Sequence, residues 1–263
     1  MDAGAFVATL PMYDWPEVRA ANDELWNCLR VSLRDHGFPA PERLERGEPA
    51  DDLWRSRNLV LGQTCGLPFV RDLMQTVSVV GTPSYEIECG AGSYFSAIVV
   101  RNDSDIEDIA DLKGRRLAYN SPCSQSGYAG LAYHLRDLAG DAPIFSEKIQ
   151  SGSHRESVRM IAGDKADVAA IDAVAWRLAQ RHEPAASGLR VLALTEPLPG
   201  LPMICARNNG WSVDRMHLAV VEAMATLEPD IADALLLNGF APYSESDYSV
   251  IARRAERAQG VAL

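Results

Sequence analysis

The order of the expected strands and helices is the feature that most constrains the fold of this chain. Strand-length apolar runs and helical stripes alternate as β-α-β-α-β over residues 5–80 and again over 115–171, with a long apolar strand at 94–101 between them. Such an order implies sheets that are largely parallel, with their connecting loops gathered at one edge. In sheets of this kind, ligands bind outside the carboxyl ends of the strands. The chain is therefore predicted to be an α/β protein with two lobes, and its site is expected in loops that follow strands.

The composition and charge of the chain exclude several classes of protein. With 263 residues, of which 47% are hydrophobic and 23% charged, the chain can bury a core and is globular. Its formal net charge of -11 argues against a nucleic-acid partner, which is bound largely through Lys and Arg. A small anion stays a possible ligand, because local donors can override a distant surface field. No apolar run approaches the ~20 residues needed to span a bilayer, so no membrane insertion is expected.

The five cysteines and five histidines are scattered along the chain. Their spacing fits neither a zinc site nor a disulfide framework, so no metal and no cofactor is expected. Cys65 and Cys89 follow neighbouring strands and could pair if the protein is exported. The first residues lack the basic and apolar regions of a secretion signal. The protein is thus predicted to be cytoplasmic if Met1 is the native start, and periplasmic if a signal peptide was removed.

Residues 119–128, which read YNSPCSQSGY, form the strongest candidate ligand site. A short strand at 115–119 runs into a loop dense in turn formers, and a helical stripe begins at Tyr128. The start of a helix carries backbone N–H groups without intrahelical partners and a partial positive charge. Ser124 and Ser126 add hydroxyl groups there, so neutral donors could hold a small oxyanion without Lys or Arg. The alternative is an ordinary helix cap, because Ser commonly precedes helices.

Tyr13, Gln63 and Thr64 follow expected strands and could face the same crevice as the loop at 119–128. His154 lies at a helix start after a strand, Asp172 ends a strand, and Tyr94 begins the strand at 94–101. Each of them also has a purely structural interpretation. His154 could cap a helix, Tyr94 could be a strand aromatic, and Asp172 could cap the helix that follows it. Tyr13 could lie on a lobe surface, and Gln63 and Thr64 could form a plain turn. The tryptophans are expected in the core. The candidates are Tyr13, Gln63, Thr64, Tyr94, His154 and Asp172.

Five stretches together resemble the phosphate, phosphite and phosphonate solute-binding family of ABC transporters, within the type II periplasmic-binding-protein superfamily. The most specific part of the resemblance is the S-x-S-G loop followed, in the right order, by G-S-H and G-D-K-A-D-x-A-A-x-D. The stretches are LPMYDWPEV (10–18), LVLGQTCGLPF (59–69), VGTPSYEIECGAGSYFSAIVVR (80–101), DLKGRRLAYNSPCSQSGY (111–128) and GSHRESVRMIAGDKADVAAID (152–172).

The resemblance implies two α/β lobes joined by two crossover strands, with a cleft that closes on the ligand. Lobe 1 would comprise residues 1–98 and 205–263, so that the helical C-terminus returns to it, and lobe 2 would comprise residues 99–204. The family holds its anion with the loop and helix start, with a Tyr on the first crossover and with the G-S-H histidine. In this chain those residues are Ser124, Gln125, Ser126, Gly127, Tyr94 and His154.

The function implied by the resemblance is that of a solute-binding protein for phosphate, phosphite or a phosphonate. Gln125 stands where Thr is common in the family, and no secretion signal is visible. The alternative is a cytoplasmic enzyme on the same fold, similar to enzymes of the futalosine route to menaquinone, with His154 as the base. A third possibility is an intracellular sensor. We expect no enzyme activity, a monomer, and an ABC permease as partner if the protein is exported.

Overall fold

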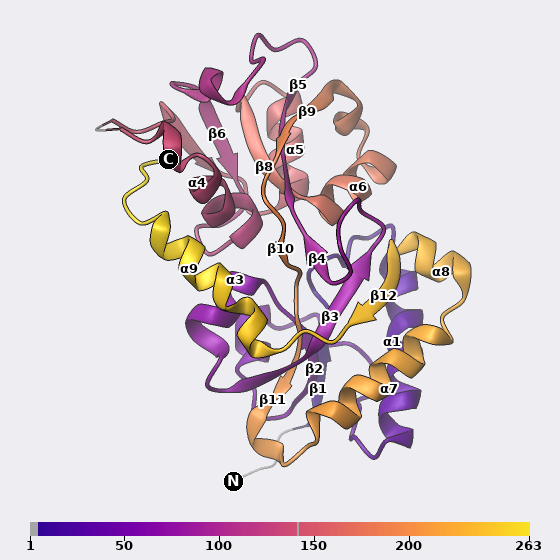
Figure 1. The fold of residues 1–263 in the computed structure, drawn as a ribbon. Helices are drawn as coiled ribbons and strands as arrows, with labels where there is room; N and C mark the ends of the chain where they lie inside the picture. The colour runs from indigo at the N-terminus through magenta and orange to yellow at the C-terminus, as the bar shows by residue number, and fades with distance from the viewer. Residues whose placement is uncertain (1–4, 141) are drawn as a thin grey trace. The chain divides into compact units, whose positions relative to one another are not determined.

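The computed structural model describes residues 5–140 and 142–263, which divide into two compact units. Unit 1 contains the described residues up to 93 together with 199–249, and unit 2 contains 94–198 and 250–263. Each unit has its own five-stranded sheet with helices packed against it (Figure 1). The chain passes between the units three times, within the very short strands β4 (Ser93–Tyr94) and β10 (Leu198–Pro199) and again between Ser249 and Val250, at the start of α9.

The sheet of unit 1 is mixed. Its strands, in spatial order, are β1 (Val7–Thr9), β2 (Leu59–Gln63), β11 (Met203–Ala206), β3 (Val77–Tyr85) and β12 (Leu237–Ala241). Strand β1 is parallel to β2, whereas β11 is antiparallel to both β2 and β3. The strands β1, β2 and β3 therefore run in one direction, and the segments that follow them leave the sheet at the same edge.

The helices of unit 1 follow the apolar stripes read from the sequence. Residues Ala21, Leu25, Trp26, Leu29 and Leu33 of α1 are buried at helical spacing, and α1 packs against α7 (Figure 1). The helices are α1 (Arg19–Asp35), α2 (Ala50–Trp54), α3 (Gly66–Pro68), η1 (Phe69–Leu73), η6 (Arg207–Asn209), α7 (Val213–Ala225), α8 (Pro229–Ala234) and η7 (Glu245–Tyr248).

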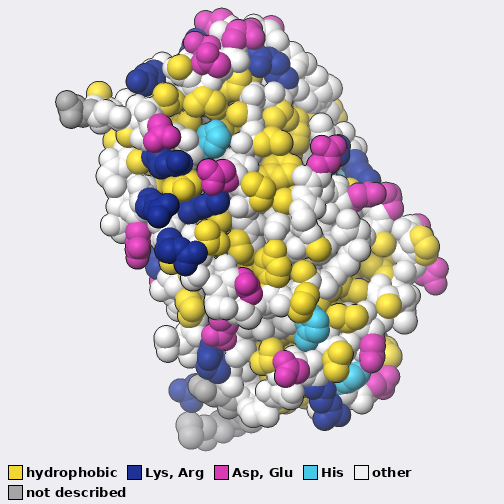
Figure 2. All heavy atoms as spheres, viewed as in Figure 1, with side chains coloured by type: hydrophobic (Ala, Val, Ile, Leu, Met, Phe, Trp, Pro, Cys, Tyr) yellow, Lys and Arg dark blue, Asp and Glu magenta, His cyan; other side chains and the backbone are white. Residues whose placement is uncertain are grey.

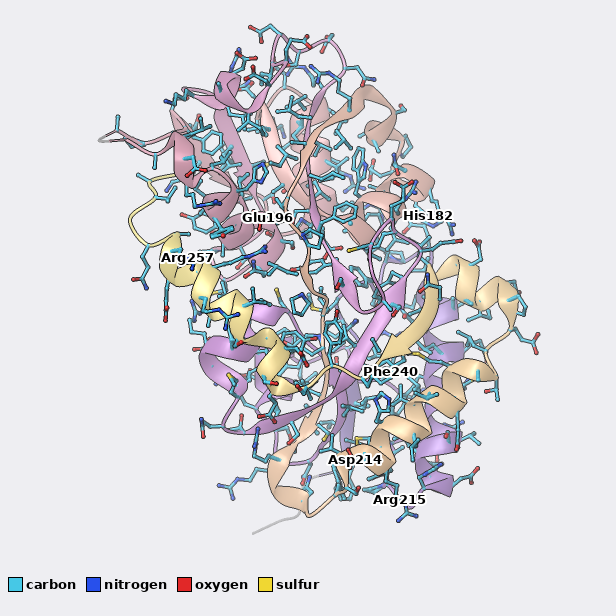
Figure 3. The ribbon with its side chains drawn as sticks, in the orientation of Figure 1. His182, Glu196, Asp214, Arg215, Phe240 and Arg257 are labelled. Atoms are coloured by element: carbon cyan, nitrogen blue, oxygen red, sulfur yellow. The ribbon has the colours of Figure 1, made fainter. Side chains whose placement is uncertain are left out.

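One expected helix of unit 1 proves to be partly a strand. The local sequence pattern predicts a helix over 228–237, but α8 ends at Ala234 and β12 then pairs with β3. Gly81 of β3 permits this pairing, because a Cβ at that position would lie 2.4 Å from the ring of Phe240. Figure 3 shows Phe240 on β12, over the neighbouring strand. Strand β12 forms by pairing with β3, which is distant in the sequence, so the local sequence pattern does not predict it.

The C-terminal part of unit 1 is fixed by the buried hydroxyl group of Tyr248. This group donates to the carbonyl of Gly200 at 3.0 Å and is hydrogen-bonded to the hydroxyl group of Thr82 at 2.6 Å. We expect Tyr248→Phe to lower the free energy of unfolding by about 1–3 kcal/mol, because it leaves buried polar groups without a partner. Urea unfolding checks this. Tyr243→Phe, at a partly exposed position, is the control. An equal loss of unfolding free energy in that variant would contradict the explanation.

The strands of the unit 2 sheet place several loops at one edge. Their spatial order is β7 (Glu147–Gln150), β6 (Arg116–Tyr119), β8 (Val168–Asp172), β5 (Ser96–Arg101) and β9 (Leu189–Leu194). Strands β7, β6 and β8 are parallel, and β5 is antiparallel to β8 and β9. The carboxyl ends of β6, β7, β8 and β9 and the amino end of β5 therefore meet at the same edge of the sheet.

The strands β5 and β8 of the unit 2 sheet are covered on both faces, as their continuous apolar sequences predict. On β5, Ile98 and Val100 join a core with Leu131 and Leu135 from the α4 region, whereas α5 and α6 contact β5 and β8 separately from that core. Figure 1 shows α4 apart from α5 and α6. The helices are η2 (Ile109–Leu112), η3 (Gln125–Ala129), α4 (Gly130–His134), η4 (Arg136–Leu138), α5 (His154–Ala162), α6 (Ala173–His182), η5 (Pro184–Gly188) and most of α9 (Ser249–Arg257).

The end of the chain belongs to unit 2, not to the first lobe as expected from the sequence. Leu263 is buried in the core described above, and the carbonyl of Ala262 accepts a hydrogen bond from the backbone N–H of Ile144 at 2.8 Å. Figure 2 shows Lys and Arg side chains gathered over α9 and the adjacent α4 region. The boundaries between the units also lie about five residues before the expected ones, at 93/94 and 198/199.

Three further observations concern membranes, metals and disulfides. None of the described helices is long and apolar enough to cross a membrane. No group of three or more His, Cys, Asp or Glu side chains in the described ranges is arranged to hold a metal ion. None of the five cysteines, all within the described ranges, forms a disulfide, so no bond joins Cys65 and Cys89 in this structure.

Candidate functional site

The polar residues of the candidate site in unit 2 gather at the sheet edge where strand ends meet. Asp172, the last residue of β8, lies opposite Ser96, the first residue of β5, in the antiparallel register. The loop that follows Tyr119 of β6 and the segment that follows β9 start from the same edge. This is the position at which open α/β sheets bind ligands.

The loop after β6 ends in a helix start, as its sequence predicts. Ser124 is the N-cap of η3, and its hydroxyl oxygen accepts the backbone N–H of Gly127 at 3.0 Å. The helix continues directly into α4, so the backbone N–H groups of its first turn, which have no acceptor within the helix, lie at the sheet edge. For the Ser124 side chain, the capping interpretation is therefore correct, and an anion could still be held by the neighbouring N–H groups.

The second helix start at this edge carries His154. The hydroxyl group of Ser151 donates to the carbonyl of Tyr119, which ties the two loops together, and Ser153 caps α5 by accepting the N–H of Glu156. His154 is the first residue of α5. Its Nε2 lies 2.9 Å from the hydroxyl oxygen of Ser126. Two loops that are separate in the sequence thus bring a hydroxyl group and an imidazole into direct contact.

The imidazole of His154 is neutral near pH 7. Burial lowers its pKa from 6.5 to about 4, because the charged form would lose its hydration. Its Nδ1 is buried and has no hydrogen-bond partner within residues 5–140 and 142–263. A neutral imidazole has one donor and one acceptor nitrogen, so one of them remains available to a bound molecule.

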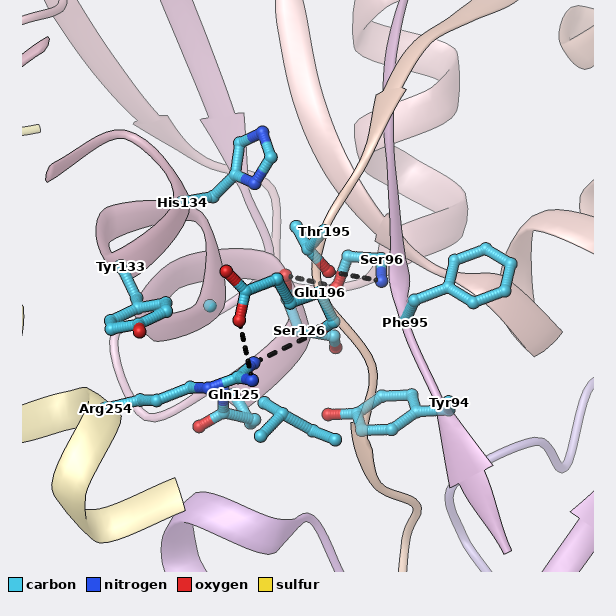
Figure 4. Close-up of a pocket in the computed structure, with 12 residues that line it drawn as sticks. Tyr94, Phe95, Ser96, Gln125, Ser126, Tyr133, His134, Thr195, Glu196 and Arg254 are labelled. Carbon is cyan, nitrogen blue, oxygen red and sulfur yellow. Dashed lines mark hydrogen bonds and ion pairs between the residues drawn. The ribbon is translucent and has the colours of Figure 1, made fainter. Parts of the chain in front are cut away.

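Ser96 and Thr195 complete a hydrogen-bonded network that the sequence analysis missed. The hydroxyl group of Ser96 donates to the carbonyl of Ser126 at 3.0 Å. The backbone N–H of Thr195 donates to the carbonyl of Ser96, and the hydroxyl oxygen of Thr195 accepts the backbone N–H of Ser96, both at 2.9 Å (Figure 4). Both residues are buried, and both occupy strand ends at the site edge. A polar residue next to an apolar strand, on the edge of the sheet where the site lies, is the sequence signal that could have identified them.

The other unit 2 candidates are buried beside this network. Tyr94, Gln125 and Asp172 are each no more than 3% exposed. The carboxylate of Asp172 accepts the N–H groups of Val174 and Ala175, at 2.9 and 3.1 Å, and thereby caps α6. The capping interpretation of Asp172 is thus correct, and its contact with a ligand stays a prediction.

The unit 1 candidates form a separate group at the corresponding edge of their own sheet. The side-chain amide of Gln63 donates to the hydroxyl group of Tyr85 at 3.0 Å. The ring of Tyr85 packs edge-on against Tyr13, with centroids 5.2 Å apart. The hydroxyl group of Thr64 is buried and donates to the carbonyl of Cys65 at 3.4 Å. The structure thus brings Tyr13 and Gln63 together around Tyr85, which the sequence analysis did not select.

The sequence and fold of this chain were compared with those of known proteins. Residues 67–248, more than half of the chain, match the family described as ABC transporter, phosphonate, periplasmic substrate-binding protein. The chain belongs to this family. The resemblance read from the sequence is therefore confirmed. The family consists of substrate-binding proteins of transporters and not of enzymes, so the enzyme alternative with His154 as a base has no support.

Solved structures show the same fold. PhnD1 from Prochlorococcus marinus (MIT 9301), in complex with methylphosphonate, is 17% identical, with a TM-score of 0.73 over 97% of this chain and 98% of that one. A binding protein component of an ABC phosphonate transporter from Pseudomonas aeruginosa is 15% identical, with a TM-score of 0.72 over 97% and 86%. XAC2383 from Xanthomonas citri, bound to chloride, is 17% identical, with a TM-score of 0.71 over 97% and 98%. The fold class predicted from the sequence, the type II periplasmic-binding-protein fold, is confirmed.

Proposed function

We propose that this member of the phosphonate-binding family binds a small tetrahedral phosphorus oxyanion at the helix starts of Ser124 and His154. The ligand class is phosphate, phosphite or a phosphonate. The observation that carries the proposal is the convergence of these two helix starts at one sheet edge, with Ser126 and His154 2.9 Å apart. Helix starts bind anions through N–H groups that have no partner within the helix.

The electrostatics of the site support binding through neutral donors. The hydroxyl group of Ser126, the neutral imidazole of His154 and the backbone N–H groups of η3 carry no formal charge. Hydrogen bonds to a charged partner contribute about 1.5–3 kcal/mol each. A few such bonds allow a dissociation constant near the micromolar range once the costs of ordering and desolvation are subtracted. The Nδ1 atom of His154, buried without a partner among the described residues, supports a further bond to the ligand.

The remaining candidates extend this proposal. We place the backbone N–H of Gln125 against the anion, because it belongs to the first turn of η3, and Gly127 beside the anion as a residue without a side chain, because its own N–H is donated to Ser124. Tyr94 and Asp172 are buried next to that turn. Tyr94 is proposed to donate a hydrogen bond from its hydroxyl group to the ligand. Asp172 is proposed to accept a hydrogen bond from an amino group on the ligand. Contacts of Tyr13, Gln63 and Thr64 with the ligand stay predictions.

The cellular role follows from the family and is proposed for this chain. The family is periplasmic and serves ABC transporters. We propose that this protein acts in the periplasm and delivers its ligand to an ABC permease. Two proteins of the same fold, one solved in complex with methylphosphonate and one a component of a phosphonate transporter, support a phosphonate as the ligand.

A ligand panel tests the proposal. The protein is titrated with phosphate, phosphite, methylphosphonate, aminoethylphosphonate, sulfate and a set of carboxylates, with thermal unfolding and calorimetry as readouts. At a concentration one hundred times its dissociation constant, a phosphorus anion is expected to raise the free energy of unfolding by about 2.7 kcal/mol. Ser126→Ala is the matched variant and should respond much less. A response to carboxylates, with none to any phosphorus anion, contradicts the proposed function.

A further inference from the structure

The side chain of Arg254, on the C-terminal helix α9, lines a pocket that adjoins the candidate site. The pocket is small, about 10 Å³, and its walls include Gln125 and Ser126 of η3 and Tyr133 of α4 (Figure 4). Arg254 is distant in sequence from all of these residues. It nevertheless belongs to the same compact unit.

Arg254 makes three contacts in this pocket. Its guanidinium group forms an ion pair with the carboxylate of Glu196 at 2.8 Å and donates to the backbone carbonyl of the same residue at 3.3 Å. It also lies over the ring of Tyr133, 5.0 Å from the centroid. The Arg254 side chain is 17% exposed and that of Glu196 is 56% exposed, so the ion pair is shielded from water on the guanidinium side only. The Arg254 side chain thus contacts both the segment after β9 and α4, the helix that continues η3.

These contacts connect through an unbroken series of bonds to residues 119–128, called the anion loop below. Glu196 is adjacent to Thr195, which is bonded twice to Ser96, and Ser96 donates to the carbonyl of Ser126. Ser126 in turn contacts His154. Figure 4 shows the bonds that join Arg254 to Glu196, Thr195 to Ser96 and Ser96 to Ser126.

We infer that Arg254 is a positioning residue for the anion loop. By holding Glu196 and Tyr133, it fixes Ser96 and the start of η3 in the arrangement that binds the ligand. The inference rests on the proposed function for its effect on affinity, but not for its effect on the loop itself. The C-terminal helix would then be part of the binding machinery and not a passive tail.

Arg254→Gln tests this inference, with Arg257→Gln as the control. Both variants remove one positive charge from α9, but Arg257 is exposed and lies apart from Glu196 in Figure 3. The first readout is hydrogen exchange of the backbone amides of residues 124–129 in the ligand-free protein. Exchange should be at least about 5-fold faster in Arg254→Gln and unchanged in Arg257→Gln, because loosened segments open more often.

The second readout is the affinity for methylphosphonate or whichever panel anion binds best. It should fall about 2- to 30-fold in Arg254→Gln, the range for a residue that acts through others. The affinity of Arg254→Lys should lie between those of the wild type and of Arg254→Gln, because lysine keeps the charge but loses the forked contact with Glu196. Unchanged exchange of residues 124–129 in Arg254→Gln overturns the inference, even if no anion binds. Full rescue of affinity by Arg254→Lys also overturns it, since charge alone would then suffice.

Discussion

Replacing Gly127 with alanine is expected to lower the affinity for the best-binding phosphorus anion about 100-fold or more, the loss of two charge-assisted hydrogen bonds. An ideal Cβ at this position would lie 2.1 Å from Oδ1 of Asn120 and 3.1 Å from Cε1 of His154. The methyl group therefore has to displace the anion loop, the Asn120 side chain or the imidazole. Because Gly127 also donates its N–H to Ser124, any such shift disturbs the first turn of η3. Calorimetric titration measures the effect.

Two further variants make the Gly127 prediction specific. Gly188→Ala, in η5 of the same unit, adds a methyl group with nothing within 4 Å and should leave the affinity unchanged. Asn120→Ala combined with Gly127→Ala removes the closest obstacle and should recover part of the affinity, as the His154 contact needs a shift of only tenths of an ångström. Near wild-type affinity in the single variant Gly127→Ala would show that the ligand does not rely on this turn.

The capped helix start within residues 119–128 could be predicted from the sequence because its determinants are local. Ser124 caps a helix through its own side chain, and Gly127 permits a close approach three residues later. Both are short-range effects that a reader of the sequence can weigh. The strand–loop–helix order around them follows from hydrophobic periodicity in the same way. The two-unit α/β architecture was predictable on the same grounds.

The parts that could not be predicted depend on contacts between distant segments. Ser96 and Thr195 come together only through the register of β5 and β9, about one hundred residues apart. The pairing of β12 with β3 and the return of residues 250–263 to unit 2 are likewise tertiary choices. The neutrality of His154 depends on burial, which no spacing in the sequence reveals. Arg254 reaches the site only because α9 packs there.

Acid is expected to destabilise the ligand-free protein through His154. Its pKa is lowered in the folded state, from 6.5 to about 4, because burial disfavours the charged imidazole. The unfolded chain therefore binds the proton more readily, and the contribution of His154 to stability is complete above pH 6.5 and lost as the pH falls towards 4. The unfolding free energy of His154→Gln should decline less over that interval. Parallel curves for the two proteins would show that the imidazole is not the group that titrates.

At neutral pH, His154→Ala is expected to weaken binding of the phosphorus anion by about 10- to 100-fold, because one hydrogen bond to a charged ligand is lost. The alanine also leaves the hydroxyl group of Ser126 without the imidazole that it contacts at 2.9 Å. His182→Ala is the matched control, because His182 lies at the end of α6 in the same unit, and it should bind as the wild type does. Calorimetry with methylphosphonate and phosphate provides the measurement. If His154→Ala bound with unchanged affinity, the imidazole would play no part in holding the anion, and the proposed site would have to be relocated away from the start of α5.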